Sequence, residues 1–141
     1  MKPSRVFFAC VLLSQLATPL HADSPLQLPG KPMTPAEFSA YAVGRTLSYA
    51  ADGMIWGQEQ YLPNRQVLWA FTGQDCQFGQ WYSQDNAVCF VYEGDDEPKC
   101  WNFFMGARGL IAELIGDGLS PLAEVGQSNQ PLECQGPQVG A

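Results

Sequence analysis

Two glutamates, Glu59 and Glu113, could perform acid–base chemistry, because each lies in a segment that is otherwise largely apolar. Paired carboxyl groups about 5 to 10 Å apart hydrolyse glycosides without help from histidine. A carboxyl that points into an apolar interior also has a raised pKa, which suits it to donate a proton. Strand residues alternate between two faces, however, so an outward, solvated glutamate is the ordinary alternative. A carboxylate-based hydrolase is therefore our third choice of function.

Histidine-dependent catalysis is not expected, because the single histidine, His21, lies in an N-terminal segment typical of a signal peptide. Lys2 and Arg5 precede an apolar run over residues 6–17, and Ala22 is a suitable cleavage residue. Cleavage after Ala22 would leave no imidazole for Ser-His-Asp or Cys-His systems or for the usual zinc sites. We expect a periplasmic or secreted protein that is not an enzyme. Residues 1–22 would be the signal peptide, 23–33 a proline-rich leader, 34–134 a single β-rich domain and 135–141 a C-terminal tail.

The cysteines point to disulfides rather than to a metal. Removal of Cys10 with the signal peptide would leave an even set in an oxidising compartment, which is Cys76, Cys89, Cys100 and Cys134. They occur singly, without the paired spacing of zinc ligands. The acidic stretch Glu93–Glu97 could attract calcium weakly, but its spacing is not that of a calcium-binding loop. We therefore expect neither a metal nor a cofactor.

The charge limits the partners. The chain has a formal net charge of −7, and loss of Lys2 and Arg5 would make it −9. Such a surface repels phosphate backbones and anionic lipid headgroups, so we expect no nucleic-acid partner. The only long apolar run is shorter than the roughly 20 residues of a membrane span, so no membrane insertion is expected after cleavage. A small apolar ligand and a basic periplasmic protein remain as partners.

The pattern along the chain is that of an all-β domain with one helix in front. Thr34, Pro35 and Glu37 form the start signals of a helix over 34–43, which Gly44 ends. Short aromatic or β-branched runs then alternate with turn residues about every ten positions. The connections are too short for parallel crossovers, so we expect an antiparallel meander. The predicted strands are Arg45–Ala50, Met54–Tyr61, Val67–Phe71, Phe78–Ser83, Val88–Tyr92, Lys99–Phe104, Leu110–Ile115 and a weaker one at Leu122–Val125.

Aromatic residues are abundant, and the four tryptophans are the candidate ligand-binding residues. They are Trp56, Trp69, Trp81 and Trp101. Aromatic residues are common in strands, and packing in the core is the plainer interpretation. The alternative is a barrel mouth or exposed patch that binds an apolar ligand or a protein.

The central stretch resembles an uncharacterised bacterial secreted family, domain of unknown function 995. The resemblance covers residues 34–113 and lies in the order of these motifs: Gly44-Arg45-Thr46-Leu47, Glu59-Gln60-Tyr61-Leu62-Pro63, Gly79-Gln80-Trp81, Val88-Cys89-Phe90 and Cys100-Trp101. It implies a small periplasmic β-rich domain and carries over no catalytic residues. It also implies a disulfide between Cys89 and Cys100, which leaves Cys76 to pair with Cys134. A hairpin turn at Gly94-Asp95 would bring Cys89 opposite Cys100.

Gly79-Gln80-Trp81 is also similar to the G-x-W motif of lipocalins, although that motif lies on their first strand and here it is central. We predict a small antiparallel meander that closes into a barrel, lipocalin-like in shape, behind one short capped α-helix. The predicted function is a non-catalytic, disulfide-stabilised binding or interaction module. The alternative is an inhibitor or partner of an envelope protein that acts through its acidic surface.

Overall fold

The computed structural model describes residues 26 and 28–134. The predicted signal peptide, with His21 and Cys10, and the predicted tail at 135–141 lie outside the described residues, as does part of the leader. Within the described part, no helix is long and apolar enough to cross a membrane.

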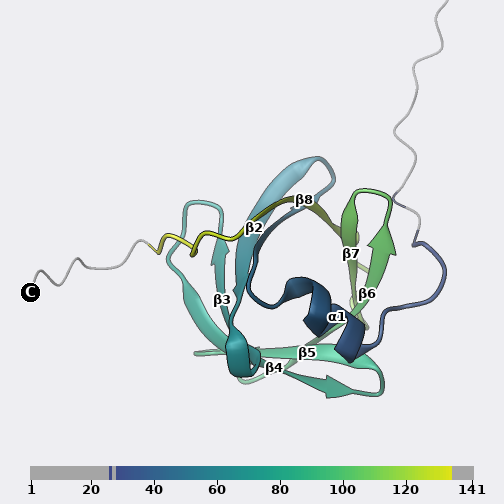
Figure 1. The fold of residues 1–141 in the computed structure, drawn as a ribbon, viewed down its shortest axis with the longest axis horizontal. Helices are drawn as coiled ribbons and strands as arrows, with labels where there is room; N and C mark the ends of the chain where they lie inside the picture. Colours follow the sequence, from purple (N-terminus) through teal and green to yellow (C-terminus); the bar gives the residue numbers. More distant parts are fainter. Residues whose placement is uncertain (1–25, 27, 135–141) are drawn as a thin grey trace, which may run out of the picture.

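Eight antiparallel strands form a closed barrel (Figure 1). Each strand pairs with the next in the chain, and the last pairs with the first, as the meander pattern predicted. The strands are β1 (Thr46–Ala51), β2 (Met54–Tyr61), β3 (Gln66–Phe71), β4 (Gln77–Gln84), β5 (Ala87–Tyr92), β6 (Lys99–Gly106), β7 (Gly109–Leu114) and β8 (Leu122–Ser128).

Tight two-residue turns form the β1–β2 and β4–β5 connections of this meander. Residues 52 and 53 both have positive φ, as do Asp85 and Asn86, and such pairs suit two-residue hairpins whose twist matches the strands.

Successive hairpins point to opposite ends of the barrel. The β1–β2, β3–β4, β5–β6 and β7–β8 connections therefore share one end, and the β2–β3, β4–β5 and β6–β7 connections share the other.

Helix α1 (Pro35–Ala42) lies within the ring of strands in Figure 1 and closes the second of these ends. Thr34 caps it as predicted: its Oγ1 accepts from the Glu37 amide at 3.2 Å, and the Glu37 carboxylate accepts from the Thr34 amide at 2.7 Å. Phe38 and Ala42 are fully buried on its inner face. The Phe38 ring lies 4.3 Å from that of Phe103 and 5.5 Å from that of Trp81, so the helix completes the core.

Glu124 on β8 holds α1 and β7 in place at this closed end. Its buried carboxylate accepts a hydrogen bond from the Tyr41 hydroxyl at 2.9 Å and one from the Leu110 amide at 2.8 Å. A single side chain thus links the helix to two strands. Between β7 and β8 the backbone register itself comprises only two pairs, Ile111 with Ala123 and Ala112 with Leu122.

The structure contains two disulfides: Cys89–Cys100, which the resemblance implied, and Cys76–Cys134, the pairing that this leaves for the other two cysteines. Cys89 faces Cys100 across β5 and β6, as the expected register required. The turn itself lies one residue earlier than expected, at residues 93 and 94, as the hydrogen bond from the Asp95 amide to the Tyr92 carbonyl shows. The pairing of β5 with β6 ends at Phe90 and Lys99, so the two strands separate before the tip of the hairpin. The chain then makes a tight turn directly after Tyr92, the last residue of β5.

The segment after β8 runs back over the outside of the barrel. The Gln130 carbonyl accepts from the Thr46 hydroxyl at 2.7 Å, and the Leu132 amide donates to the Gln60 side chain at 3.0 Å. Cys134 then bonds to Cys76, just ahead of β4. In Figure 1 this yellow segment passes β2 and β3. The disulfide therefore ties residues 129–134 to the open end of the barrel.

Candidate functional site

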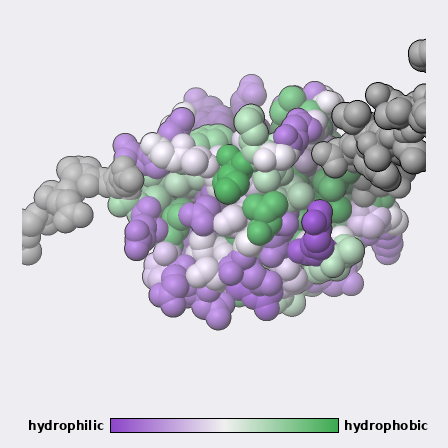
Figure 2. Space-filling model, turned by 90° about the horizontal axis from the view of Figure 1, so that it is seen from above, coloured by the Kyte–Doolittle hydropathy of each residue, from purple (hydrophilic) through white to green (hydrophobic). Residues whose placement is uncertain are grey.

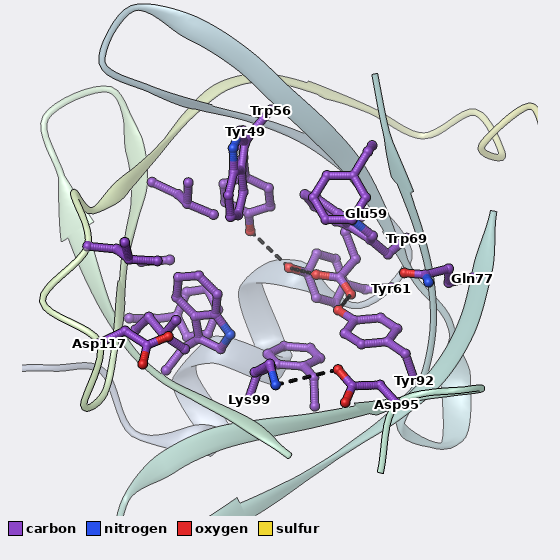
Figure 3. A pocket seen from close by; sticks show the side chains of 18 residues that line it. Tyr49, Trp56, Glu59, Tyr61, Trp69, Gln77, Tyr92, Asp95, Lys99 and Asp117 are labelled. Carbon is purple, nitrogen blue, oxygen red and sulfur yellow. Dashed lines mark hydrogen bonds and ion pairs between the residues drawn. The ribbon is translucent and has the colours of Figure 1, made fainter. Parts of the chain in front are cut away.

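A cavity of about 380 Å³ occupies the barrel interior and opens at the end opposite α1. Its wall is mostly aromatic, because the inward positions of successive strands carry aromatic rings. The rings come from Tyr49, Trp56, Tyr61, Trp69, Phe71, Phe90, Tyr92, Trp101 and Phe103, with Ala112, Leu114, Leu119 and Leu122 on the β7–β8 side (Figure 3).

One carboxyl group, that of Glu59, lies buried in this aromatic wall. The side chain is 5% exposed. Its Oε1 accepts a hydrogen bond from the Tyr92 hydroxyl at 2.6 Å, and its Oε2 accepts one from Tyr61 at 2.9 Å. The Tyr49 and Tyr61 hydroxyls are 2.9 Å apart, so three tyrosines from three strands form one network with the carboxyl (Figure 3).

Burial sets the electrostatics of this network. Desolvation raises the pKa of Glu59 to about 7, although the hydrogen bonds from Tyr92 and Tyr61 favour the charged form and limit the rise. Desolvation also raises the pKa of Tyr49, Tyr61 and Tyr92 well above the ordinary value, so these hydroxyls stay neutral. Near neutral pH, Glu59 can therefore gain or lose a proton while its partners cannot.

Two glycines make room for the rings of the wall. A Cβ at Gly57 would lie 2.6 Å from the Trp69 ring and would also meet the Ala70 carbonyl. A Cβ at Gly79 would lie 2.7 Å from the Tyr92 ring. Glycine inside a strand is often explained by such a close approach. Here the absent side chains let Trp69 and Tyr92 take the positions that line the cavity.

The mouth of the cavity carries the remaining charges. Lys99 pairs with Asp95 at 3.5 Å, and both side chains are about 40% exposed. Asp117, on the β7–β8 connection, is exposed. Within the described residues, the acidic stretch 93–97 forms no cluster of three or more metal-binding side chains, and Asp95 contributes to the mouth.

Three of the four predicted tryptophans line the cavity, which are Trp56, Trp69 and Trp101. Trp81 does not. It is buried at the closed end, where it contacts Phe38 of α1 and lies beneath the Arg65 guanidinium, 5.2 Å from the ring centre. The difference follows from position along the strands, because Trp81 points inward at the end that the helix closes.

The two glutamates first considered for hydrolysis are not brought together. Glu59 faces the cavity, whereas its proposed partner Glu113 lies between two lining residues, Ala112 and Leu114, and so points out of the barrel. Its nearest polar partner is the Asn102 amide on the neighbouring strand, at 3.5 Å. The pair therefore lacks the shared cleft that two-carboxylate hydrolysis needs.

Sequence reasoning did not predict that tyrosines would join Glu59 in a hydrogen-bonded network. Glu59 and Tyr61 are two residues apart on a strand and must share a face, so their contact could have been predicted from the sequence. Tyr49 and Tyr92 join it through the closure of the barrel. No pattern within a single segment predicts that side chains of β1, β2 and β5 meet, because their meeting depends on the closure of the whole barrel.

Comparison with known proteins found no match for this chain among family models, curated proteins or solved structures. The function is therefore argued from the geometry of the cavity.

Proposed function

We propose that this protein binds a small, largely apolar molecule inside the barrel and that it is not an enzyme. The observation that carries the proposal is the aromatic cavity of about 380 Å³, open at one end. Ligand sites are typically concave spaces of about 300 to 1,000 Å³, lined by apolar side chains with a few polar groups that orient the ligand. The Glu59 network would supply those polar groups here.

The arrangement of the barrel supports binding over hydrolysis. Neither of the other two carboxyls considered lies beside Glu59: Glu124 is buried but is bound at the closed end by Tyr41 and the Leu110 amide, and Glu113 lies on the outer face. Its hydrogen-bond partners are tyrosines with raised pKa values, which hold the carboxyl in place but do not titrate with it. A fixed, hydrogen-bonded acceptor in an apolar cavity suits recognition of a ligand.

The expected compartment is part of the same proposal. The two disulfides are compatible with an oxidising compartment. We propose a periplasmic or secreted protein, as the N-terminal sequence indicates.

Native mass spectrometry of protein purified from its own periplasm tests the proposal directly. We expect a co-purifying small molecule, and displacement of the neutral fluorescent probe N-phenyl-1-naphthylamine by that molecule. Leu114→Trp should fill the cavity near its mouth and weaken probe binding about tenfold or more. Ala70→Trp, on the outer face of β3, is the control. Absence of both ligand and probe binding in the wild type would contradict the proposal.

A protein partner is the runner-up, supported by the net charge of −7 and by exposed apolar residues near the open end. Met54 and Ile55, beside the β1–β2 turn, are 71% and 62% exposed. Figure 2 shows apolar side chains grouped near the middle of one face, among polar ones. A co-purifying basic protein, with an empty cavity, would favour this alternative.

A further inference from the structure

The buried carboxyl of Glu59 has no cationic partner in the described part of the chain. The single ion pair there joins Lys99 to Asp95 at the mouth, and the contacts of Glu59 are hydroxyl groups of tyrosines. An ionised carboxylate buried without a counter-charge is costly, and protein interiors ordinarily pair or neutralise such groups. A positive charge beside Glu59 is thus what the described cavity lacks.

The wall around Glu59 also suits a cation. The faces of aromatic rings attract positive charge through their quadrupole, by roughly 0.5 to 2 kcal/mol for each good contact. The Tyr49, Trp69 and Tyr92 rings all line the cavity near the carboxyl (Figure 3). They would hold the flat, apolar body of a ligand while leaving its charged group free to reach Glu59.

The other ionisable groups that face the cavity do not oppose a cation. Tyr49 on β1, Tyr61 on β2 and Tyr92 on β5 are neutral, because burial raises the pKa of each. At the mouth, Lys99 is offset by Asp95, and Asp117 adds one negative charge. With Glu59 ionised, the cavity is therefore net negative, and it sits in a chain of net charge −7. An anionic ligand would therefore meet net repulsion.

We propose that the ligand is an organic cation, a protonated amine on a flat, largely apolar body, and that its ammonium group binds the Glu59 carboxylate between the tyrosine hydroxyls. This inference rests on the proposed binding function and defines its ligand class.

Binding of such a ligand must release a proton from Glu59 when the carboxyl starts protonated. The pKa of this group is about 7 in the empty protein, and an adjacent ammonium would lower it. Since the ionised form is the one that pairs with the ammonium, affinity should rise with pH and level off above about 7. Between about pH 6 and about pH 8, the expected gain is about tenfold.

Three probes of the same shape test the charge preference by titration calorimetry. Tryptamine carries an ammonium, 3-propylindole replaces it with a methyl group, and indole-3-propionate replaces it with a carboxylate. At about pH 8, tryptamine should bind about tenfold or more tighter than 3-propylindole, and indole-3-propionate should bind weakest. Only tryptamine should gain affinity between about pH 6 and about pH 8 and release protons to the buffer.

Two matched variants identify the carboxyl responsible. Glu59→Gln preserves the size of the side chain, and it should abolish the preference for tryptamine together with its pH dependence. Glu113→Gln removes the same charge from the outer face and should leave both intact. If Glu59→Gln does not fold, as judged by circular dichroism, the probe series and the pH dependence of the wild type still decide the question.

Equal binding of tryptamine and 3-propylindole by the wild type would overturn the cation proposal and leave the apolar-ligand function standing. Tighter binding of indole-3-propionate would overturn it as well. Failure of all three probes and of N-phenyl-1-naphthylamine to bind would count against the binding function itself.

Discussion

At the scale of single residues, the notable feature is the carboxyl group of Glu59, which the fold buries away from solvent. Most buried polar groups are satisfied by hydrogen bonds, and Glu59 meets this requirement with two tyrosine hydroxyls at 2.6 and 2.9 Å. Hydrogen bonds alone do not replace the lost water, because desolvation still raises the pKa of Glu59 to about 7. The protein therefore becomes less stable as this group ionises.

The direction of the resulting pH dependence follows from proton binding. The folded protein keeps the Glu59 proton up to about pH 7, whereas the unfolded chain releases it near its ordinary pKa of 4.5. Between these values the unfolded state binds fewer protons, so this group makes the free energy of unfolding fall as the pH rises from 4.5 to about 7. Above that the contribution is constant.

We predict a loss on the order of 3 kcal/mol across this window in the wild type, which Glu59→Gln should remove. Urea unfolding at about pH 5 and about pH 8 measures the difference. Glu113→Gln is the control, because it removes a carboxyl from the outer face and should keep the Glu59 contribution. The same pH dependence in wild type and Glu59→Gln would show that another group is responsible.

Residue types alone could not decide between the two glutamates. Both Glu59 and Glu113 lie in apolar strands, and the sequence is equally consistent with either facing inward. The structure separates them by register: Glu59 shares its face with Tyr61, and Glu113 lies between the inward residues Ala112 and Leu114. A shift of one residue would have exchanged these outcomes.

At the scale of elements, helix α1 acts as the closed floor beneath the cavity. Phe38 provides its main contact, with ring centres 5.4 Å from Tyr61 and 4.3 Å from Phe103. Both of those residues also line the cavity. The helix thus supports the wall without contributing to it.

Phe38→Ala should lower the free energy of unfolding by about 3 to 5 kcal/mol, because it leaves a void where four aromatic rings meet the helix. Phe78→Ala is the matched control. That ring is 56% exposed at the start of β4, so its removal should cost less than about 1 kcal/mol. Thermal and urea unfolding give both values, and equal losses would contradict the role assigned to the helix.

The elements were largely predictable because their signals are local. The capping residues around Thr34 and the turn residues at Asp52-Gly53 and Asp85-Asn86 are short-range features, and the structure has the helix and eight strands there within a few residues. The departures occur at strand ends. For example, β8 continues to Ser128 instead of ending at Val125, because it pairs with β1 across the barrel closure.

At the scale of the whole molecule, the two disulfides differ in how much chain they enclose. Cys76 and Cys134 are 58 residues apart in the sequence, and Cys89 and Cys100 are 11 apart. In the chain-entropy account, a bridge stabilises more when its loop is longer, which corresponds to about 4 and about 3 kcal/mol for these loops.

The Cys76→Ala/Cys134→Ala double variant should therefore be less stable than the Cys89→Ala/Cys100→Ala variant. Urea unfolding of both, after non-reducing peptide mapping of the wild type, tests this order. A Cys76/Cys134 variant as stable as the wild type would show that residues 129–134 do not belong to the cooperative folding unit. The hydrogen bonds of Gln130 and Leu132 to β1 and β2 argue that they do.

Neighbouring strands of the barrel are joined by unequal numbers of backbone pairs and covalent links, and this bears on how the cavity could change size. A disulfide joins β5 to β6, and hydrogen bonds hold residues 130 and 132 against β1 and β2. In contrast, β7 and β8 share only the pairs of Ile111 with Ala123 and Ala112 with Leu122. Ala112 and Leu122 are themselves cavity residues, and Glu124 links these two strands at the closed end. The β7–β8 side, toward the mouth, is therefore the part of the wall with the fewest backbone pairs. We expect a ligand too large for the cavity of about 380 Å³ to be accommodated by widening of the barrel on that side.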